Sequence, residues 1–150
     1  MDNHAVHNGG GIRARVKTKG DIILINNVFT KNKADDHGGG ALARSVTDGD
    51  IIFMNNSFVE NESQKNGAGV FARIHIDGDI TFINNTFASN NSQNHGGGAF
   101  LKVSGADDII DFINNTLTQN NAQKRGGGVY FYVDDSDAEA SIYNNIIWGN

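Results

Sequence analysis

The stretch that decides the fold is the third of five similar segments: residues 67–95 read GAGVFARIHIDGDITFINNTFASNNSQNH. After the opening glycine-rich triplet, residues 70–76 alternate between apolar and polar side chains, which is the period of a β-strand. Residues 77–79, Asp-Gly-Asp, mark a turn, because Gly adopts positive φ and Asp side chains bond to nearby backbone. Residues 80–84 alternate again, so the segment predicts short strands joined by turns.

The same pattern recurs along the whole chain. Glycine-rich triplets end at Gly11, Gly40, Gly69, Gly98 and Gly128, in steps of 29, 29, 29 and 30 residues. An apolar residue three before an asparagine recurs in the same register, at Phe29, Phe58, Phe87, Leu117 and Ile147. These markers identify internal repeats in a single domain spanning residues 1–150, at approximately 3–31, 32–60, 61–89, 90–119 and 120–149.

A repeat of 29–30 residues with three short strands has the size of one rung of a β-solenoid. Each strand pairs in parallel with its copy one rung away, and the other sides of the rung supply the crossover. We therefore expect an all-β, right-handed parallel β-helix of five rungs, the hand following the general preference of parallel crossovers. Residues 91–95 are expected to form a polar loop, and no cap is recognisable at either end.

The pairing of Gly-Gly-apolar with Phe-x-x-Asn resembles the repeats of right-handed parallel β-helix proteins of bacterial surfaces. These include the polymorphic outer-membrane proteins of chlamydial type and large secreted β-helix adhesins. The closing residues 142–150, IYNNIIWGN, are also similar to repeats of the large secreted proteins. The resemblance covers the whole chain and implies an extracellular or cell-surface location. It does not specify an activity, because adhesins, polysaccharide lyases and phage tailspikes share the scaffold.

The composition excludes several classes of protein. The chain contains no Cys, so a disulfide scaffold, a thiolate metal site and a cysteine nucleophile are excluded. A net charge of −5 argues against nucleic acid as a partner. No apolar run approaches the roughly 18 residues of a membrane span, and the N-terminal residues lack the features of a signal peptide.

The asparagine pairs carry a structural expectation. We expect the first member of each pair to point inward at a bend, where stacked amides bond from rung to rung and the left-handed backbone conformation is tolerated. These ladder residues are Asn26, Asn55, Asn84, Asn114 and Asn144. A second ladder is expected at the end of Phe-x-x-Asn, at Asn32, Asn61, Asn90 and Asn120.

Two outward columns on the first strand of each rung form a candidate binding face. One contains Arg15, Arg44, Arg73, Lys102 and Tyr132, and its neighbour contains Arg13, Leu42, Phe71, Phe100 and Tyr130. Like charges about 4.8 Å apart repel, so an acidic polysaccharide is an expected partner, with cation–π contacts to the aromatic column as a further relief. The alternative is that the long side chains simply cover the sheet.

A column on the second strand is apolar although alternation points it outward. It contains Ile25, Met54, Ile83, Ile113 and Tyr143. An exposed apolar stripe of this length is typical of an interface, so we expect it to mediate self-association, unless a segment outside this chain covers it.

The turns that follow the first strand contain Asp21, Asp50, Asp79 and Asp108. Stacked carboxylates could bind Ca²⁺, although one Asp per turn is also ordinary turn chemistry. No other cofactor is expected, because the histidines do not cluster in the sequence.

Two functions follow from these patterns. The chain begins and ends at the same point of the repeat, so it is either an excerpt of a longer solenoid or a subunit that stacks head to tail into a fibre. We expect a non-enzymatic structural protein, as a fibre or a surface stalk or adhesin segment. The alternative is a module that binds acidic polysaccharide. An enzyme is disfavoured, because no carboxylates converge in one distinctive rung.

Overall fold

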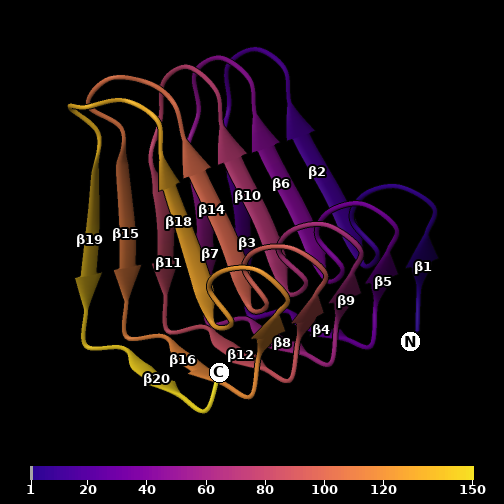
Figure 1. The fold of residues 1–150 in the computed structure, drawn as a ribbon. Coiled ribbons are helices and arrows are strands. Elements are labelled where there is room, and N and C mark those ends of the chain that lie inside the picture. The colour runs from indigo at the N-terminus through magenta and orange to yellow at the C-terminus, as the bar shows by residue number, and fades with distance from the viewer. Residues whose placement is uncertain (1) are drawn as a thin grey trace.

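The computed structural model describes residues 2–150, and over this range the chain contains strands but no helix. The strands stack in parallel as a β-solenoid of five rungs, which confirms the expected fold class (Figure 1). Accordingly, none of these residues belongs to a helix long and apolar enough to span a membrane.

Each rung contributes one strand to each of four sheets, which we name after their first strands. The β1 sheet contains β1 (His4–Ala5), β5 (Lys33–Ala34), β9 (Glu62–Ser63), β13 (Asn91–Ser92) and β17 (Asn121–Ala122). The β2 sheet contains β2 (Ile12–Val16), β6 (Ala41–Ser45), β10 (Val70–Ile74), β14 (Ala99–Val103) and β18 (Val129–Val133). The β3 sheet contains β3 (Ile22–Ile25), β7 (Ile51–Met54), β11 (Ile80–Ile83), β15 (Ile109–Ile113) and β19 (Glu139–Tyr143). The β4 sheet contains β4 (Val28–Thr30), β8 (Ser57–Val59), β12 (Thr86–Ala88), β16 (Thr116–Thr118) and β20 (Ile146–Trp148).

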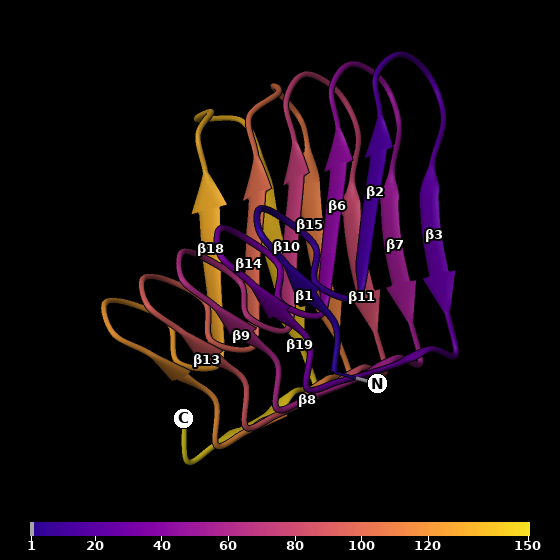
Figure 2. The same ribbon diagram turned by 90° about the vertical axis from the view of Figure 1, so that its right-hand side faces the viewer.

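The β2 and β3 sheets lie face to face, and the β4 sheet closes one end of the space between them (Figures 1 and 2). The β1 sheet and the loops that follow it extend outside the β2 sheet (Figure 2). A rung therefore has four strands where we expected three, because residues 91–92 pair in parallel with their equivalents in both neighbouring rungs. The β1-sheet strands escape sequence recognition because each has only two residues, a polar one followed by a small Ala or Ser such as the buried Ser63 or Ser92.

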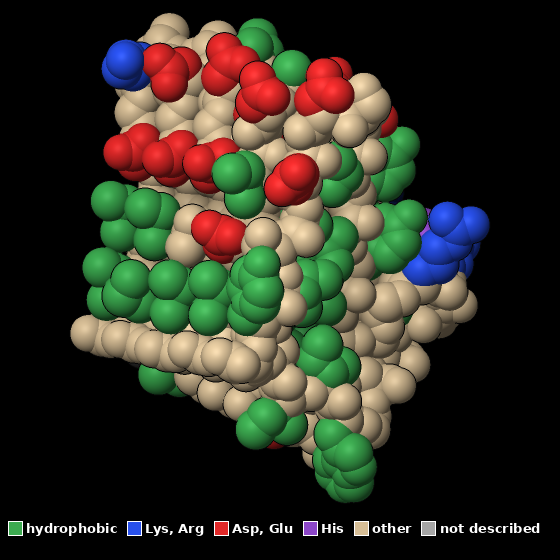
Figure 3. Space-filling view, turned by 90° about the vertical axis from the view of Figure 1, so that its left-hand side faces the viewer, with side chains coloured by type: hydrophobic (Ala, Val, Ile, Leu, Met, Phe, Trp, Pro, Cys, Tyr) green, Lys and Arg blue, Asp and Glu red, His purple; other side chains and the backbone are tan. Residues whose placement is uncertain are grey.

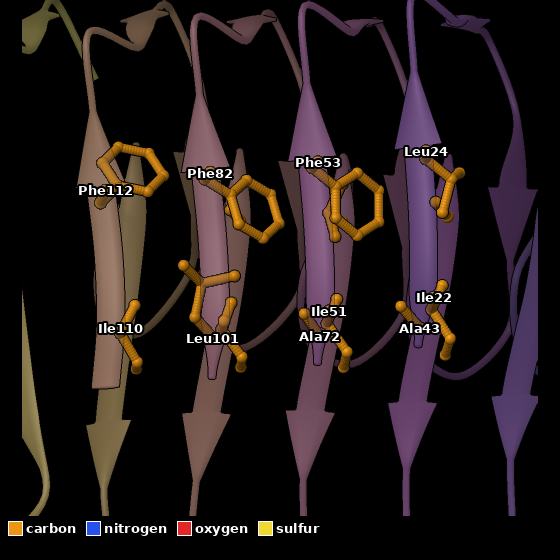
Figure 4. Close-up of a cluster of buried hydrophobic side chains, with 14 of the residues drawn as sticks. Ile22, Leu24, Ala43, Ile51, Phe53, Ala72, Phe82, Leu101, Ile110 and Phe112 are labelled. Carbon is orange, nitrogen blue, oxygen red and sulfur yellow. The ribbon is translucent and has the colours of Figure 1, made fainter. Parts of the chain in front are cut away.

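The inward side chains follow the expected alternation and fill the space between the sheets (Figure 4). Phe53 and Phe82 of the β3 sheet stack with their ring centroids 4.6 Å apart. Phe58 stacks on Phe29 at 4.8 Å and on Phe87 at 5.0 Å, with the planes nearly parallel. Equivalent side chains thus contact each other from rung to rung, and their burial is the main source of stability.

The glycine triplets join the β1 sheet to the β2 sheet. The first glycine of each triplet has a φ between 64° and 70°, in the left-handed region that only glycine adopts freely. At the third glycine the neighbouring rung passes too close for a side chain. A Cβ on Gly69 would lie 2.4 Å from the carbonyl oxygen of Gly98 and 3.0 Å from the ring of Phe87.

The asparagine pairs form their ladder one residue later than we expected. Asn26, Asn55, Asn84, Asn114 and Asn144 all have a φ between 53° and 58°, and their side chains are exposed. A residue in this left-handed conformation turns the corner between the β3 and β4 sheets, so the next side chain points inward. The amide ladder is therefore made by Asn27, Asn56, Asn85, Asn115 and Asn145.

Within this ladder every side-chain amide has the same polarity. The Nδ2 atom of Asn56 donates to Oδ1 of Asn85 at 3.1 Å and to the carbonyl oxygen of Leu24 at 2.8 Å. The ladder at Asn32, Asn61, Asn90 and Asn120 is confirmed, and its amides bond from rung to rung in the same direction.

Candidate functional site

The outer face of the β2 sheet has a column of cationic side chains held in register by parallel pairing. Arg15 pairs with Arg44, Arg44 with Arg73, and Arg73 with Lys102. We call Arg15, Arg44 and Arg73 the arginine column. Because paired residues of adjacent strands lie about 4.8 Å apart, the column concentrates positive charge along the solenoid axis.

In the second and third rungs, a histidine contacts the arginine column. A terminal nitrogen of Arg44 lies 2.5 Å from Nε2 of His75. Burial, together with the charges of Arg73 and Arg44, lowers the pKa of His75 to about 4. His75 is therefore neutral at pH 7 and accepts a hydrogen bond from Arg44. Burial and the neighbouring arginines also lower the pKa of Arg44.

Among the described residues, no carboxylate lies within ion-pair distance of the three arginines, although the charge of Asp134, which pairs with Lys102, also acts on Arg73. Lys102, the next member of the cationic column, forms an ion pair with Asp134 at 2.8 Å. None of the ion pairs found in residues 2–150 involves one of the three arginines. The Nε atoms of Arg44 and Arg73 are shielded from solvent and have no hydrogen-bond partner in the described part of the chain. Such donors are costly to leave unpaired.

A small pocket opens beside these unpaired donors. Its volume is about 160 Å³, and it is lined by Asn8, Arg13, Arg15, His37, Leu42, Arg44, Phe71 and Arg73. The loop that precedes each glycine triplet forms its wall, where the backbone N–H of His37 donates to Oδ1 of Asn8 at 3.3 Å. We call this pocket the arginine cleft.

The aromatic column expected beside the arginines is not exposed. Phe71 and Phe100 stack at 5.1 Å and are only 8% and 6% exposed, because the loops before the triplets cover them. The ring centroids of His37 and Phe71 lie 4.5 Å apart, and those of the stacked rings of His95 and Tyr130 lie 5.0 Å apart. These aromatic residues form a second small core, so the prediction of an open aromatic face is wrong.

Tyr130 and Tyr132 continue the two columns in the last rung. Tyr130 is half-buried against Phe100, with the ring centroids 5.5 Å apart. Tyr132 is exposed, and the Nζ atom of Lys102 lies 4.1 Å from its ring centroid. We expected cation–π contacts between the cationic and the aromatic column. The contact that occurs joins Lys102 and Tyr132, which both belong to the cationic column, at the end opposite to Arg15.

The apolar column on the β3 sheet faces outward as expected (Figure 3). Parallel pairing aligns its members, Ile25, Met54, Ile83, Ile113 and Tyr143, which we call the apolar stripe. Ile25 is 46% exposed and Tyr143 58%, and the three members between them are partly exposed. Figure 3 shows an unbroken apolar row on this face, separated by a mixed row from the mostly acidic rows near the turns.

The turn aspartates act as structural acceptors. The carboxylate of Asp21 accepts the backbone N–H of Asp50 at 3.0 Å, and Asp50 accepts that of Asp79 at 2.9 Å. Asp79 bonds to the N–H of Ile109, whereas Asp108 is buried and bonds to Gly105 and Gly78. Burial raises the pKa of Asp108. Among residues 2–150 no three His, Cys, Asp or Glu side chains come together as a metal site would require, so we propose no calcium site.

A wider hollow of about 550 Å³ lies at the corner between the β4 and β1 sheets. Its charges are paired between adjacent rungs, with Lys31 lying 3.7 Å from Glu60 and Lys33 lying 3.2 Å from Glu62. The lysines of this hollow thus have carboxylate partners, whereas the arginines of the arginine cleft form no ion pair.

Sequence reasoning missed the residues that wall the arginine cleft. Asn8 and His37 stand directly before glycine triplets, as do Asn66, His95 and Arg125. A polar residue stands at this position in all five repeats, which could have indicated a role shared by every rung. In three rungs its side chain accepts a hydrogen bond from the backbone N–H of the next rung. Comparison of the chain with protein-family models, with curated proteins and with solved structures finds no match.

Proposed function

We propose that this chain is a non-enzymatic structural solenoid that stacks head to tail with copies of itself. The observation that carries the proposal is the uniform polarity of the amide ladders, which makes the first and last rungs complementary. Inside the molecule, Nδ2 of Asn115 donates to Oδ1 of Asn145 in the following rung. In a stack, the Asn145 amide would donate in the same way to Asn27 of the next copy.

The apolar side chains of the two end rungs support the same stacking. Ile142 and Ile147 of the last rung are inward residues by register, yet they are 49% and 51% exposed. In a stack they would cover Leu24 and Phe29 of the next copy, as Phe112 and Leu117 are covered within the chain. Such a heterologous contact does not close and produces a fibre.

The apolar stripe supports lateral contact between such fibres. It crosses all five strands of the β3 sheet, and a continuous stack would prolong it along the whole fibre. Together with the resemblance to bacterial surface β-helix repeats, these features favour an extracellular fibre or a surface stalk or adhesin segment.

Electron microscopy and light scattering over a concentration series test the proposal. We expect unbranched fibres with an axial repeat on the order of 24 Å, from five rungs at the strand spacing. Ile147→Lys should abolish fibres, because it places a charge between stacked rungs. Ile83→Lys, on the apolar stripe, should leave single fibres but remove side-by-side bundles. A monodisperse monomer at all concentrations would refute head-to-tail stacking.

A further inference from the structure

We infer that the arginine cleft and the arginine column bind a linear acidic polysaccharide that runs along the solenoid axis. This inference rests on the β2-sheet face alone and is independent of head-to-tail stacking.

The first argument is that the three arginines form no ion pair, whereas cationic residues in several other columns do. At three other columns, residues at equivalent positions of adjacent rungs carry opposite charges and form ion pairs: Lys19 with Asp48, Lys31 with Glu60, and Lys33 with Glu62. The equivalent positions of the arginine column carry three like charges in succession. An anionic ligand would supply what the column lacks.

The second argument is the geometry of the unpaired donors. The Nε atoms of Arg44 and Arg73 are buried and unpartnered in the described residues, on adjacent strands and beside the arginine cleft. A guanidinium group presents a planar fork that fits a carboxylate or sulfate with two parallel hydrogen bonds. His75 accepts a hydrogen bond from a terminal nitrogen of Arg44, which restrains the guanidinium group.

The third argument identifies the ligand as a chain with repeating charges. The three arginines occupy successive rungs, and Lys102, which also pairs with Asp134, extends the cationic positions to a fourth rung, a length of roughly 14 Å at the strand spacing. A linear polymer with an anionic group on successive sugars can meet several of these positions at once. A single small anion can meet only one or two.

The fourth argument favours a polysaccharide over a single-stranded nucleic acid. Nucleic-acid strands are bound on exposed aromatic side chains that stack with bases. Here Phe71 and Phe100 are buried beneath the loops, and the chain carries a net charge of −5. Acidic residues crowd the turns between the β2 and β3 sheets, so a polyanion is confined to the axial direction.

Isothermal titration at low salt tests the inference with four probes of similar length: an oligogalacturonate, a heparin oligosaccharide, a neutral dextran fragment and oligo-dT. Inorganic sulfate is titrated separately. We expect at least one acidic oligosaccharide to bind, more weakly as salt is raised, and neither dextran nor oligo-dT to match it. Inorganic sulfate should bind more weakly than the oligosaccharide and compete with it.

The variant Arg44→Gln/Arg73→Gln should weaken this binding at least tenfold. Arg44→Lys/Arg73→Lys keeps the charge but removes the planar forks. Its affinity for the oligosaccharide should lie between that of the glutamine variant and that of the parent chain. The matched control is Lys31→Gln/Lys33→Asn, which removes two charges at the far corner. It uses residues that the repeat already has at equivalent positions, Gln119 and Asn121. Thermal melts check that each variant folds.

Three results would overturn the inference. The first is that neither acidic oligosaccharide binds the folded parent chain. The second is that the control variant loses as much affinity as the arginine variant, which would indicate a general charge effect. The third is that oligo-dT binds more tightly, or that sulfate binds as tightly as the oligosaccharides, which would exclude a polysaccharide site.

Discussion

Replacing one ladder asparagine with alanine tests how the rungs are joined. Asn85 is 1% exposed, and its side chain makes four hydrogen bonds. Its Oδ1 atom accepts the backbone N–H and the Nδ2 of Asn56 at 2.9 and 3.1 Å. Its Nδ2 atom donates to Phe53 at 2.9 Å and to Asn115 at 3.0 Å. Asn85→Ala removes all four bonds and leaves the buried N–H of Asn56 without this acceptor.

The magnitude follows from these bonds. A typical hydrogen bond contributes about 1 kcal/mol, and a stranded buried donor adds a penalty of about 1–3 kcal/mol. Asn85→Ala should therefore lower the free energy of unfolding by about 5–7 kcal/mol. At about 2–4 °C per kcal/mol for a chain of this size, Tm should fall by at least roughly 10 °C. Urea titration followed by circular dichroism gives the free energy, and calorimetry gives Tm.

The neighbouring asparagine is the matched control. Asn84 is exposed and has a φ of 56°, so its role is conformational. Asn84→Ala should cost only about 1–2 kcal/mol, the penalty of the left-handed region, and Asn84→Gly should cost less still. If Asn84→Ala destabilised the chain more than Asn85→Ala, the assignment of the amide ladder would be wrong.

Three further predictions concern the core, the triplets and pH. Phe87→Ala should lower the free energy of unfolding by about 3–5 kcal/mol in urea titration, because the ring is fully buried and stacks on Phe58; a loss below 1 kcal/mol would contradict the stacked core. Gly69→Ala should destabilise by about 1–3 kcal/mol or more, since the new Cβ would lie 2.4 Å from the Gly98 carbonyl oxygen; an unchanged urea midpoint would contradict this close approach. The pKa of His75, about 4, lies below its ordinary value of 6.5, so the unfolded chain binds more protons between these pH values. Stability should therefore fall as pH is lowered from 6.5 towards 4, and urea midpoints for the parent chain and His75→Gln should converge; a parent midpoint that rises on acidification would contradict the shift.

The repeat made the fold predictable, because each marker fixes a local geometry that recurs in every rung. Alternation placed the core correctly, since a strand buries every second side chain whatever its partner. Alternation failed at the bend. There one residue in the left-handed conformation, such as Asn84, shifts the pattern by one position, so that Asn85 and not Asn84 points inward. Alternation also could not find the two-residue strands of the β1 sheet, which lack a pattern long enough to alternate.

The candidate site was harder to predict because its exposure depends on contacts between loops and strands. The sequence placed Phe71 and Phe100 outward, and they do lie outside the main core. What hides them is the loop before each triplet, whose path depends on the β1 sheet that sequence reasoning missed. The register of the cationic column, in contrast, followed directly from the repeat length.

The two proposals reinforce each other through the geometry of the repeat. In a head-to-tail stack the column would read Arg15, Arg44, Arg73, Lys102 and Tyr132, and would then begin again at Arg15 of the next copy. The uncharged Tyr132 position would separate successive cationic stretches, so a fibre would present equal binding sites about 24 Å apart. A long polysaccharide could span several of these sites, and its binding would be strengthened by effective concentration without any new contact. A short oligosaccharide could occupy only one site, so stacking would leave its affinity unchanged. The dependence of affinity on ligand length would thus connect the arginine column of one sheet face to the assembly state of the whole molecule.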